Sequence, residues 1–311
     1  MKNMIKKAMC LMLASALVFT GVPAAISNAA ETENEAPSIA PPHNVRFEIN
    51  VDNEGIENLI VYWDAVEGAE GYILKYTFDY IKEREDMKVV SVSADETSVM
   101  IELPTEVDYG SVMVFASAVK GGVAGSDTEA SMLKTDIDAQ METAHAVYDA
   151  KYALAKKAQT LGKSDRKKDK TLGISCILKD INGDSIPELL YFRHYNRSEV
   201  LIYRYDAMAN AAKLVKTTAG EKSLGGVSDI RMTKSGKGIV VWASDSAYSG
   251  SVTTYKLTTA GKLKASTTYN FDYNKKKYTK NGKKISKAKL EKYLDSYVAL
   301  ESIGDNTILY E

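Results

Sequence analysis

The sequence has few of the residues that most often carry chemistry. Its 311 residues include three histidines, two cysteines, two tryptophans and six prolines. No zinc-binding motif and no Gly-x-Ser-x-Gly nucleophile motif occurs. So few cysteines exclude a disulfide framework. Beyond residue 30, no apolar run approaches the about 20 residues that span a bilayer. We therefore expect neither a zinc enzyme, nor a small disulfide-stapled domain, nor a multi-spanning membrane protein.

The rest of the composition is that of a folded chain. Hydrophobic residues make up 45% and charged residues 26%, which is ordinary for globular proteins. At about 100–200 residues per domain, the length predicts two domains. The formal net charge of -1 is a cancellation, because residues 1–30 carry +3, residues 31–135 carry -14 and residues 136–311 carry +10. An acidic N-terminal part thus precedes a basic C-terminal part.

The N-terminus predicts export. Lysines precede the apolar run 8–20, and small residues at 27–29 offer a cleavage site, so we interpret residues 1–29 as a secretory signal peptide. Its removal would take Cys10 away and leave Cys176 as the only cysteine. We expect a monomer without a transmembrane segment, either secreted and extracellular or held non-covalently at the cell surface.

A β-sandwich is predicted after a linker. Residues 30–42 are acidic and contain prolines, which is typical of an extended linker. Residues 43–134 then contain β-rich runs at the spacing of a sandwich. These runs are Val45–Ile49, Leu59–Trp63, Gly71–Phe78, Lys88–Val92, Ser98–Leu103, Ser111–Val119 and Thr128–Leu133.

Within this region, specific segments resemble bacterial fibronectin type III domains. The segment 63–72 (WDAVEGAEGY) is similar to the second-to-third strand segment of that family, and 99–104 (VMIELP) continues the pattern. Tyr109 stands where the family has its tyrosine corner. The resemblance implies an immunoglobulin-like sandwich that serves as a spacer or binding module. Trp63, Tyr72, Tyr76 and Tyr109 are expected in the core rather than on a sugar-stacking platform.

Residues 136–311 predict an α+β domain. A helix over Asp136–Leu161 is followed by a charged, mobile loop at 162–170, and a final helix begins after the cap residue Ser286. Between the helices lie the strand-like runs Ile174–Leu178, Leu189–His194, Val200–Tyr205, Lys213–Lys216, Asp229–Thr233, Gly238–Ser244, Thr253–Thr258 and Leu263–Tyr269. The short connections favour an antiparallel meander sheet flanked by two helices, or an incomplete propeller, over a parallel sheet. The whole chain is therefore predicted to be mainly β.

One loop carries a recognisable pattern of oxygen ligands. Side-chain oxygens recur at Asp180, Asn182 and Asp184, the main-chain carbonyl of Ile186 follows in phase, and Glu188 completes the set. A hard cation such as Ca²⁺ takes 6–8 oxygens, and a tight loop with alternating acidic residues supplies them. These five residues are the predicted metal ligands, and calcium is the expected ion, in a structural role.

The same loop resembles known calcium loops. It is similar to the calcium loop of integrin-type propeller repeats, and to an Asp-Ile-Asp-Gly-Asp-Gly-Ile-Pro-Glu-Leu signature of secreted bacterial domains. It departs from them at Ser185, where glycine is usual, and it occurs once, whereas propellers repeat it. The alternative interpretation is a hairpin connection built from Asx turns without an ion.

A lysine-rich segment follows near the C-terminus. It contains Lys275, Lys276, Lys277, Lys280, Lys283 and Lys284, interleaved with aromatic residues. Such a face could hold a polyanion such as a cell-wall polymer, although a lysine run is more often only a solvated surface. The cluster has no arginine for bidentate contacts, so sequence-specific nucleic-acid binding is not expected.

These patterns favour a non-catalytic role. We predict a secreted extracellular or cell-surface binding or adhesion protein, with a glycan or cell-wall polymer as its partner. The alternative is a secreted carbohydrate-active hydrolase, or an accessory module of one, because fibronectin type III modules accompany glycan-degrading enzymes. No catalytic residue is assigned. His145 lies beside an apolar helix stripe and is expected to be a histidine at a buried edge rather than a metal ligand.

Overall fold

The computed structural model describes residues 39–78, 87–105, 110–194 and 198–303. The predicted signal peptide, most of the linker and Tyr109 lie outside this part. The described chain is mainly β, with two helices. Neither helix is long and apolar enough to cross a membrane.

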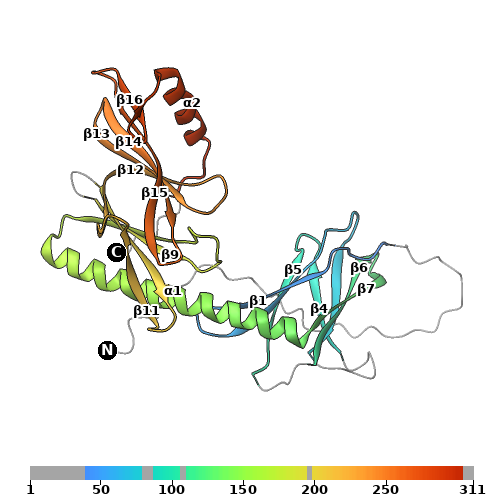
Figure 1. The fold of residues 1–311 in the computed structure, drawn as a ribbon. Helices are drawn as coiled ribbons and strands as arrows, with labels where there is room; N and C mark the ends of the chain where they lie inside the picture. The colour runs from blue at the N-terminus through green and yellow to red at the C-terminus, as the bar shows by residue number, and fades with distance from the viewer. Residues whose placement is uncertain (1–38, 79–86, 106–109, 195–197, 304–311) are drawn as a thin grey trace, which may run out of the picture. The chain divides into compact units, whose positions relative to one another are not determined.

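The N-terminal region is the predicted sandwich (Figure 1). One antiparallel sheet has the order β1-β2-β5 and the other the order β4-β3-β6-β7. The strands are β1 (Arg46–Val51), β2 (Glu57–Tyr62), β3 (Gly71–Thr77), β4 (Lys88–Ser93), β5 (Ser98–Glu102), β6 (Ser111–Lys120) and β7 (Val123–Leu133). Two such layers bury one face of each strand, as the alternating sequence predicts.

The sandwich core contains the aromatic residues that the sequence assigns to it. Leu59 and Val61 are fully buried, and Trp63 packs edge-to-face on Tyr72 with ring centroids 5.3 Å apart. Tyr76 is also buried in this cluster. These three aromatic side chains therefore act as core residues and offer no sugar-stacking platform.

The last residues of the predicted linker belong to the sandwich. Ile39 is 7% exposed and packs into the core, where Gly125 leaves room for its backbone. The hydroxyl of Thr128 on β7 donates a hydrogen bond to the carbonyl of Pro42. The ordered sandwich thus begins before residue 43.

Helix α1 (Lys134–Lys168) contacts both regions. Its first half packs Ile137 into the sandwich core, and Gln140 accepts a hydrogen bond from the backbone N–H of Ile49. Its second half contributes Leu154 and Ala158 to an apolar cluster with the following strands. The helix is therefore shared between two cores, and does not belong only to the C-terminal domain.

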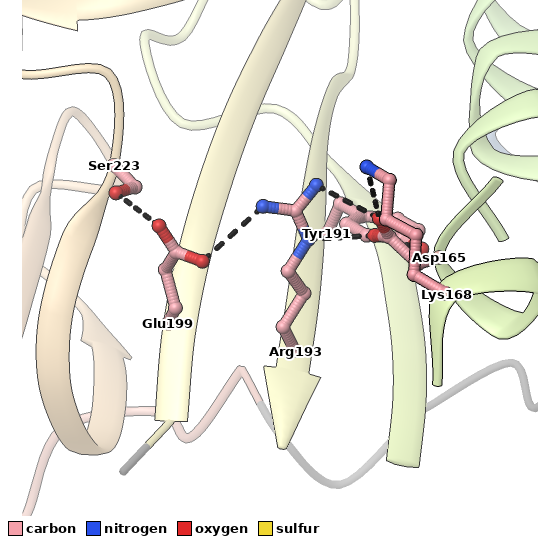
Figure 2. Close-up of polar contacts among 6 residues, drawn as sticks. All are labelled: Asp165, Lys168, Tyr191, Arg193, Glu199 and Ser223. Atoms are coloured by element: carbon pink, nitrogen blue, oxygen red, sulfur yellow. Dashed lines mark hydrogen bonds and ion pairs between the residues drawn. The ribbon is translucent and has the colours of Figure 1, made fainter. Parts of the chain in front are cut away.

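The prediction of a mobile loop at 162–170 is wrong, because α1 continues to Lys168. Gly162 does not stop the helix, since the next turn is anchored. Asp165 is 4% exposed and accepts hydrogen bonds from Arg193 on the neighbouring sheet (Figure 2). This buried ion pair outweighs the low helix propensity of glycine, which costs about 1 kcal/mol.

The C-terminal sheet contains the predicted antiparallel meander, but part of it closes on itself. Its strands are β8 (Gly173–Lys179), β9 (Glu188–His194), β10 (Ser198–Asp206), β11 (Ala211–Thr217), β12 (Leu224–Met232), β13 (Ile239–Ser246), β14 (Ser249–Leu257), β15 (Lys262–Asp272), β16 (Lys277–Lys280) and β17 (Lys283–Lys284). Their main order is β17-β16-β15-β14-β13-β12-β10-β9-β8, and the meander runs from β12 to β17. β11 pairs antiparallel with β10 and parallel with β15. This closes β10-β12-β13-β14-β15-β11 into a six-stranded barrel, and an incomplete propeller is excluded.

Three apolar clusters stabilise this barrel domain. One contains inward residues such as Ile202 and Ile239. The second lies under α1 and includes Tyr191. The third lies under α2 (Lys287–Val298), whose Leu290 is fully buried. Both outer clusters cover faces of the sheet that would otherwise expose apolar surface to water.

Candidate functional site

The 180–188 loop connects two paired strands. Lys179 on β8 and Glu188 on β9 are partners in the ladder, so the ends of the loop are held side by side. Gly183 has a φ of 81°, and a Cβ there would lie 2.8 Å from Cε of Lys237. Only glycine fits this turn without displacing the lysine stem that covers it.

Within the loop, carboxylates accept backbone hydrogen bonds. Asp180 accepts the N–H groups of Asn182 at 3.0 Å, Gly183 at 2.7 Å and Ser185 at 2.8 Å. Asp184 accepts the N–H of Ile186 at 2.9 Å. These bonds are the successive Asx turns of the alternative interpretation, so the loop holds its shape with its own groups.

The side chain of Asn182 lies between two carboxylates. Its Nδ2 donates to Asp184 Oδ2 at 2.9 Å and to Glu188 Oε1 at 2.8 Å. The structure thus brings together Asp180, Asn182, Asp184 and Glu188, four of the five predicted ligands. For Ile186, the recorded contact is made by its N–H and not by the predicted carbonyl.

Glu188 is the buried residue of this group. It is 3% exposed, and its Oε2 accepts the backbone N–H of Ile181 at 3.0 Å. Burial, with a smaller contribution from the charges of Asp184 and Asp180, raises the pKa of Glu188 to about 7, against the lowering effect of its hydrogen bonds. The folded protein therefore favours the protonated form of this carboxyl more than water does.

The donor set fits a hard cation after one rearrangement. As the loop stands, no three acidic, histidine or cysteine side chains of the described residues are arranged around a common metal position. The amide nitrogen of Asn182 lies where two carboxylate oxygens converge. A flip of this amide would present its oxygen at the same place, although it would break the 2.8 Å hydrogen bond that Asn182 Oδ1 accepts from the N–H of Asp184. Two carboxylates beside a carbonyl oxygen are the chemistry that Ca²⁺ prefers.

A cleft of about 340 Å³ opens beside the loop. Three segments line it: the loop, the end of β10, and the end of β14 with the turn that follows. The lining residues are Asn182, Asp184, Ile186, Glu188, Arg204, Tyr205, Leu257, Thr258 and Thr259. The volume lies in the lower part of the range of small-molecule sites, which is about 300–1,000 Å³.

The predicted polyanion-binding lysines lie on a hairpin. We call Lys275, Lys276, Lys277, Lys280, Lys283 and Lys284, which lie on β16, β17 and the adjoining turns, the lysine ribbon. Five of them are exposed and Lys280 is half-buried. Lys275 pairs with Asp272 at 3.3 Å, and Lys280 lies over the ring of Tyr269 at 5.3 Å. The ribbon is thus a concentrated positive surface.

The aromatic residues beside the lysine ribbon are mostly internal. Tyr269, Phe271 and Tyr278 are 6%, 7% and 7% exposed, and they pack beneath α2. Tyr269 stacks on Tyr293 of that helix with centroids 3.8 Å apart. They therefore form a core, and the surface next to the lysines is not an aromatic platform.

A buried polar network lies near the C-terminal end of α1 (Figure 2). Arg193 Nε donates to Asp165 Oδ2 at 2.6 Å, and its Nη1 donates to Glu199 at 3.2 Å. Tyr191 also donates to Asp165, and Ser223 donates to Glu199. The sequence does not predict this network, because its members are separated by up to 58 positions and form no motif. It joins α1 to β9, β10 and the residue that precedes β12, which is a structural role.

The sequence also does not predict a contact between a serine hydroxyl and a histidine imidazole. Ser175 Oγ lies 2.8 Å from Nε2 of His194 on the adjacent strand. The other ring nitrogen, Nδ1, lies 3.4 Å from the hydroxyl of Ser198. A nucleophilic serine needs a base that is oriented by a third group, commonly a carboxylate. Among the described residues, the pair has no such carboxylate, so we assign it no catalytic role.

His145 is a surface partner of the sandwich. Its Nε2 lies 2.7 Å from Oε1 of Glu57, and its side chain is 47% exposed. This contact joins α1 to β2. The prediction of a histidine at a buried edge is wrong, because this side chain lies on the surface, where it contacts Glu57.

Comparison with known proteins bears on the sandwich. No family model matches the chain, and no curated protein matches its sequence. A Fn3-like protein from Clostridium thermocellum is 22% identical, with 30% of this chain and 91% of that chain covered and a TM-score of 0.23. The fn3 domain of human contactin 1 is 21% identical, with 36% and 88% covered and a TM-score of 0.24. The structural neighbours of this chain are thus fibronectin type III domains, and the similarity covers about a third of the chain.

Proposed function

We propose that this protein is a secreted, non-catalytic binding protein that attaches to an anionic cell-wall polymer or glycan at the cell surface. The observation that carries this proposal is the lysine ribbon. Its lysines lie close together on one hairpin, and only Lys275 has a carboxylate partner among the described residues. Unpaired ammonium groups on a surface attract a polyanion without requiring a shaped pocket.

The sandwich supports this role as a spacer. Its core is closed and apolar, and residues 31–135 carry a formal charge of -14. A surface of that sign is repelled by an anionic polymer and keeps the protein soluble, whereas the segment 136–311, at +10, is attracted. Binding is therefore assigned to the barrel domain.

Binding to isolated cell walls tests the proposal. The full chain is sedimented with walls at low and at high ionic strength, and the bound fraction is measured. We expect strong retention at low salt that falls steeply as salt rises, since exposed charges are screened over about 10 Å at 0.1 M. Absence of retention at low salt would contradict the proposal.

A matched pair of variants locates the contact. Changing Lys275, Lys276 and Lys277 to Gln should weaken wall binding at least tenfold, because three positive charges are lost and only that of Lys275 has a carboxylate partner among the described residues. The control changes Lys163, Lys167 and Lys170 to Gln, which removes the same charge from exposed positions near the end of α1. Equal losses in the two variants would show net-charge attraction and no role for the ribbon.

For the 180–188 loop we propose a structural calcium ion. The convergence of Asp184 and Glu188 on the Asn182 amide supports it. Calorimetric titration should show binding with a Kd on the order of 10⁻⁴–10⁻³ M, as in extracellular modules, together with a higher Tm. Asp184→Asn should remove both effects. No heat and no stabilisation in millimolar calcium would exclude the ion.

One observation favours the alternative function, a carbohydrate-active hydrolase. Glu188, whose pKa is raised by burial, and Asp184 both line the cleft, and a pair of carboxyl groups is the usual catalytic apparatus of glycosidases. The 3% exposure of Glu188 weighs against it, because a general acid must reach its substrate. Release of reducing sugar by the native chain, abolished by Glu188→Gln, would establish the alternative.

A further inference from the structure

The cleft beside the 180–188 loop contains a positioned arginine that the loop does not use. A Cβ on Gly261 would lie 2.4 Å from Cζ of Arg204, so the guanidinium rests against the backbone of this glycine. Gly261 has a φ of 69°, in a turn closed by a 2.7 Å hydrogen bond from its N–H to the carbonyl of Thr258. The turn thus holds the guanidinium at the wall of the cleft.

The donors of Arg204 remain available. The side chain is half-buried, and within the described part of the chain no carboxylate or carbonyl accepts from its guanidinium. The pKa of Asp206 is lowered chiefly by its hydrogen bond from Lys213, and the nearby charge of Arg204 adds to this lowering without a hydrogen bond between the two residues. A guanidinium has five N–H donors, and Arg204 is one of the residues that line the cleft.

Groups of other kinds complete the wall. The hydroxyl of Thr258 accepts the N–H of Lys262 at 3.1 Å, so its own proton is free to donate. Thr259 is exposed and adds a second hydroxyl. On the opposite side, Asp184 offers carboxylate lone pairs, and Leu257 adds apolar surface. The cleft therefore combines strong donors, strong acceptors and a small apolar area.

This combination selects a class of ligand. Away from the proposed calcium position, an anionic ligand would be repelled by Asp184, and a cationic ligand would be repelled by Arg204. A neutral molecule with many hydroxyls avoids both penalties, because each hydroxyl can donate to a carboxylate and accept from a guanidinium. We propose that this cleft binds a neutral saccharide, through Arg204, Asp184, Thr258 and Thr259.

The inference rests on the proposed function, because it deepens the surface-binding role by assuming a glycan partner. The cleft is a different site from the lysine ribbon. Contact between hydroxyls and partly buried polar groups is short-ranged, whereas attraction of a polymer to the ribbon is screened by salt. Saccharide binding in the cleft and polymer binding at the lysine ribbon can therefore be lost independently of each other.

Saccharide binding by the full chain tests the inference. The probes are cellobiose and N,N′-diacetylchitobiose, measured by saturation-transfer NMR and titration in EDTA at high salt. We expect binding that salt does not weaken. Thr259→Phe places a ring in the cleft from an exposed turn and should reduce affinity at least tenfold. Thr218→Phe, the same change in another exposed turn, should leave it unchanged.

A second variant removes the recognition group without filling the cleft. Arg204→Gln keeps a polar side chain and should also reduce affinity at least tenfold. The ribbon variant with Lys275, Lys276 and Lys277 changed to Gln should bind saccharide normally, even if it no longer binds walls. The inference is overturned if neither saccharide binds the native chain, or if Thr259→Phe binds as well as the native chain does.

Discussion

The sandwich and the barrel domain bury different kinds of polar group. Among the described residues, the buried polar side chains of the sandwich are Asn58 and Ser117, which are both neutral. The barrel side buries two carboxyl groups, Asp165 and Glu188. A core without charges is stabilised by packing alone, whereas buried carboxyls make stability depend on their partners and on pH. The two regions should therefore respond to different perturbations.

The largest expected loss of stability comes from breaking the buried ion pair of the barrel domain. Arg193→Met removes the main partner of Asp165 and leaves a carboxylate that is 5% exposed without its charge partner. We expect a loss of about 3–5 kcal/mol in the free energy of unfolding. Urea denaturation followed by circular dichroism measures it. The control is Lys168→Ala, which removes a 73% exposed lysine from the same carboxylate and should cost less than about 1 kcal/mol. Equal losses of stability in Arg193→Met and Lys168→Ala would contradict the claim that the barrel domain depends on a buried charge pair.

The matching change in the sandwich creates a cavity. Leu74 is fully buried on β3, so Leu74→Ala removes packing contacts and no charge. The expected loss is about 2–5 kcal/mol, and it should be the same at pH 5 and pH 8. A loss that changes strongly with pH would show that the sandwich depends on a titrating group, and the comparison between the two regions would fail.

Glu188 should make the barrel domain less stable as pH rises. Its folded pKa is about 7, above its ordinary value of 4.5, so the folded state holds the proton more tightly. The stabilisation is fully present below pH 4.5 and is lost as the pH rises through 7. With about 1.4 kcal/mol for each pKa unit, the loss amounts to about 3 kcal/mol.

Unfolding measured between pH 4.5 and 8.5 in EDTA checks this prediction. Glu188→Gln should flatten the slope, because glutamine stays neutral throughout. A bound calcium ion should reverse the trend, since it favours the deprotonated carboxylate. An unchanged slope in the glutamine variant would assign the pH dependence to another group.

The smallest expected effect concerns the cap of α2. The hydroxyl of Ser286 accepts the N–H of Lys289 at 3.3 Å at the start of this helix. Ser286→Ala should cost about 1 kcal/mol, and Ser286→Asp should restore most of it. Thermal unfolding measures both. A neutral Ser286→Ala variant would show that packing beneath the helix, and not the cap, sets its stability.

Local patterns of the sequence predict most of this fold. Alternating residues around Trp63 identify the sandwich, and the oxygen spacing from Asp180 to Glu188 identifies the loop whose side chains meet in the structure. Closure of the barrel is not predictable in this way, because the parallel contact of β11 with β15 involves two residue pairs, Lys216 with Lys262 and Thr217 with Leu263. So short a ladder leaves no periodic signal.

The cleft is also not predictable from the sequence. Arg204 reads as an ordinary outward residue of a strand, and its role depends on the backbone of Gly261, which is distant in the chain. The helix through Gly162 was missed for a related reason. Its stability comes from the contact between Asp165 and Arg193, and local propensity does not report such a contact.

The shared helix α1 limits how this chain can be divided or exchanged in evolution. A cut at residue 135 would leave a C-terminal fragment with Ile137 and its neighbours Met141 and Ala144 stripped of their sandwich partners. A cut after the helix would strip Leu154 and Ala158 from the barrel side instead. Either fragment would carry an apolar stripe in water and tend to aggregate. A recombination event that transferred either domain alone would leave half of α1 without an apolar packing partner. The two domains should therefore be inherited together.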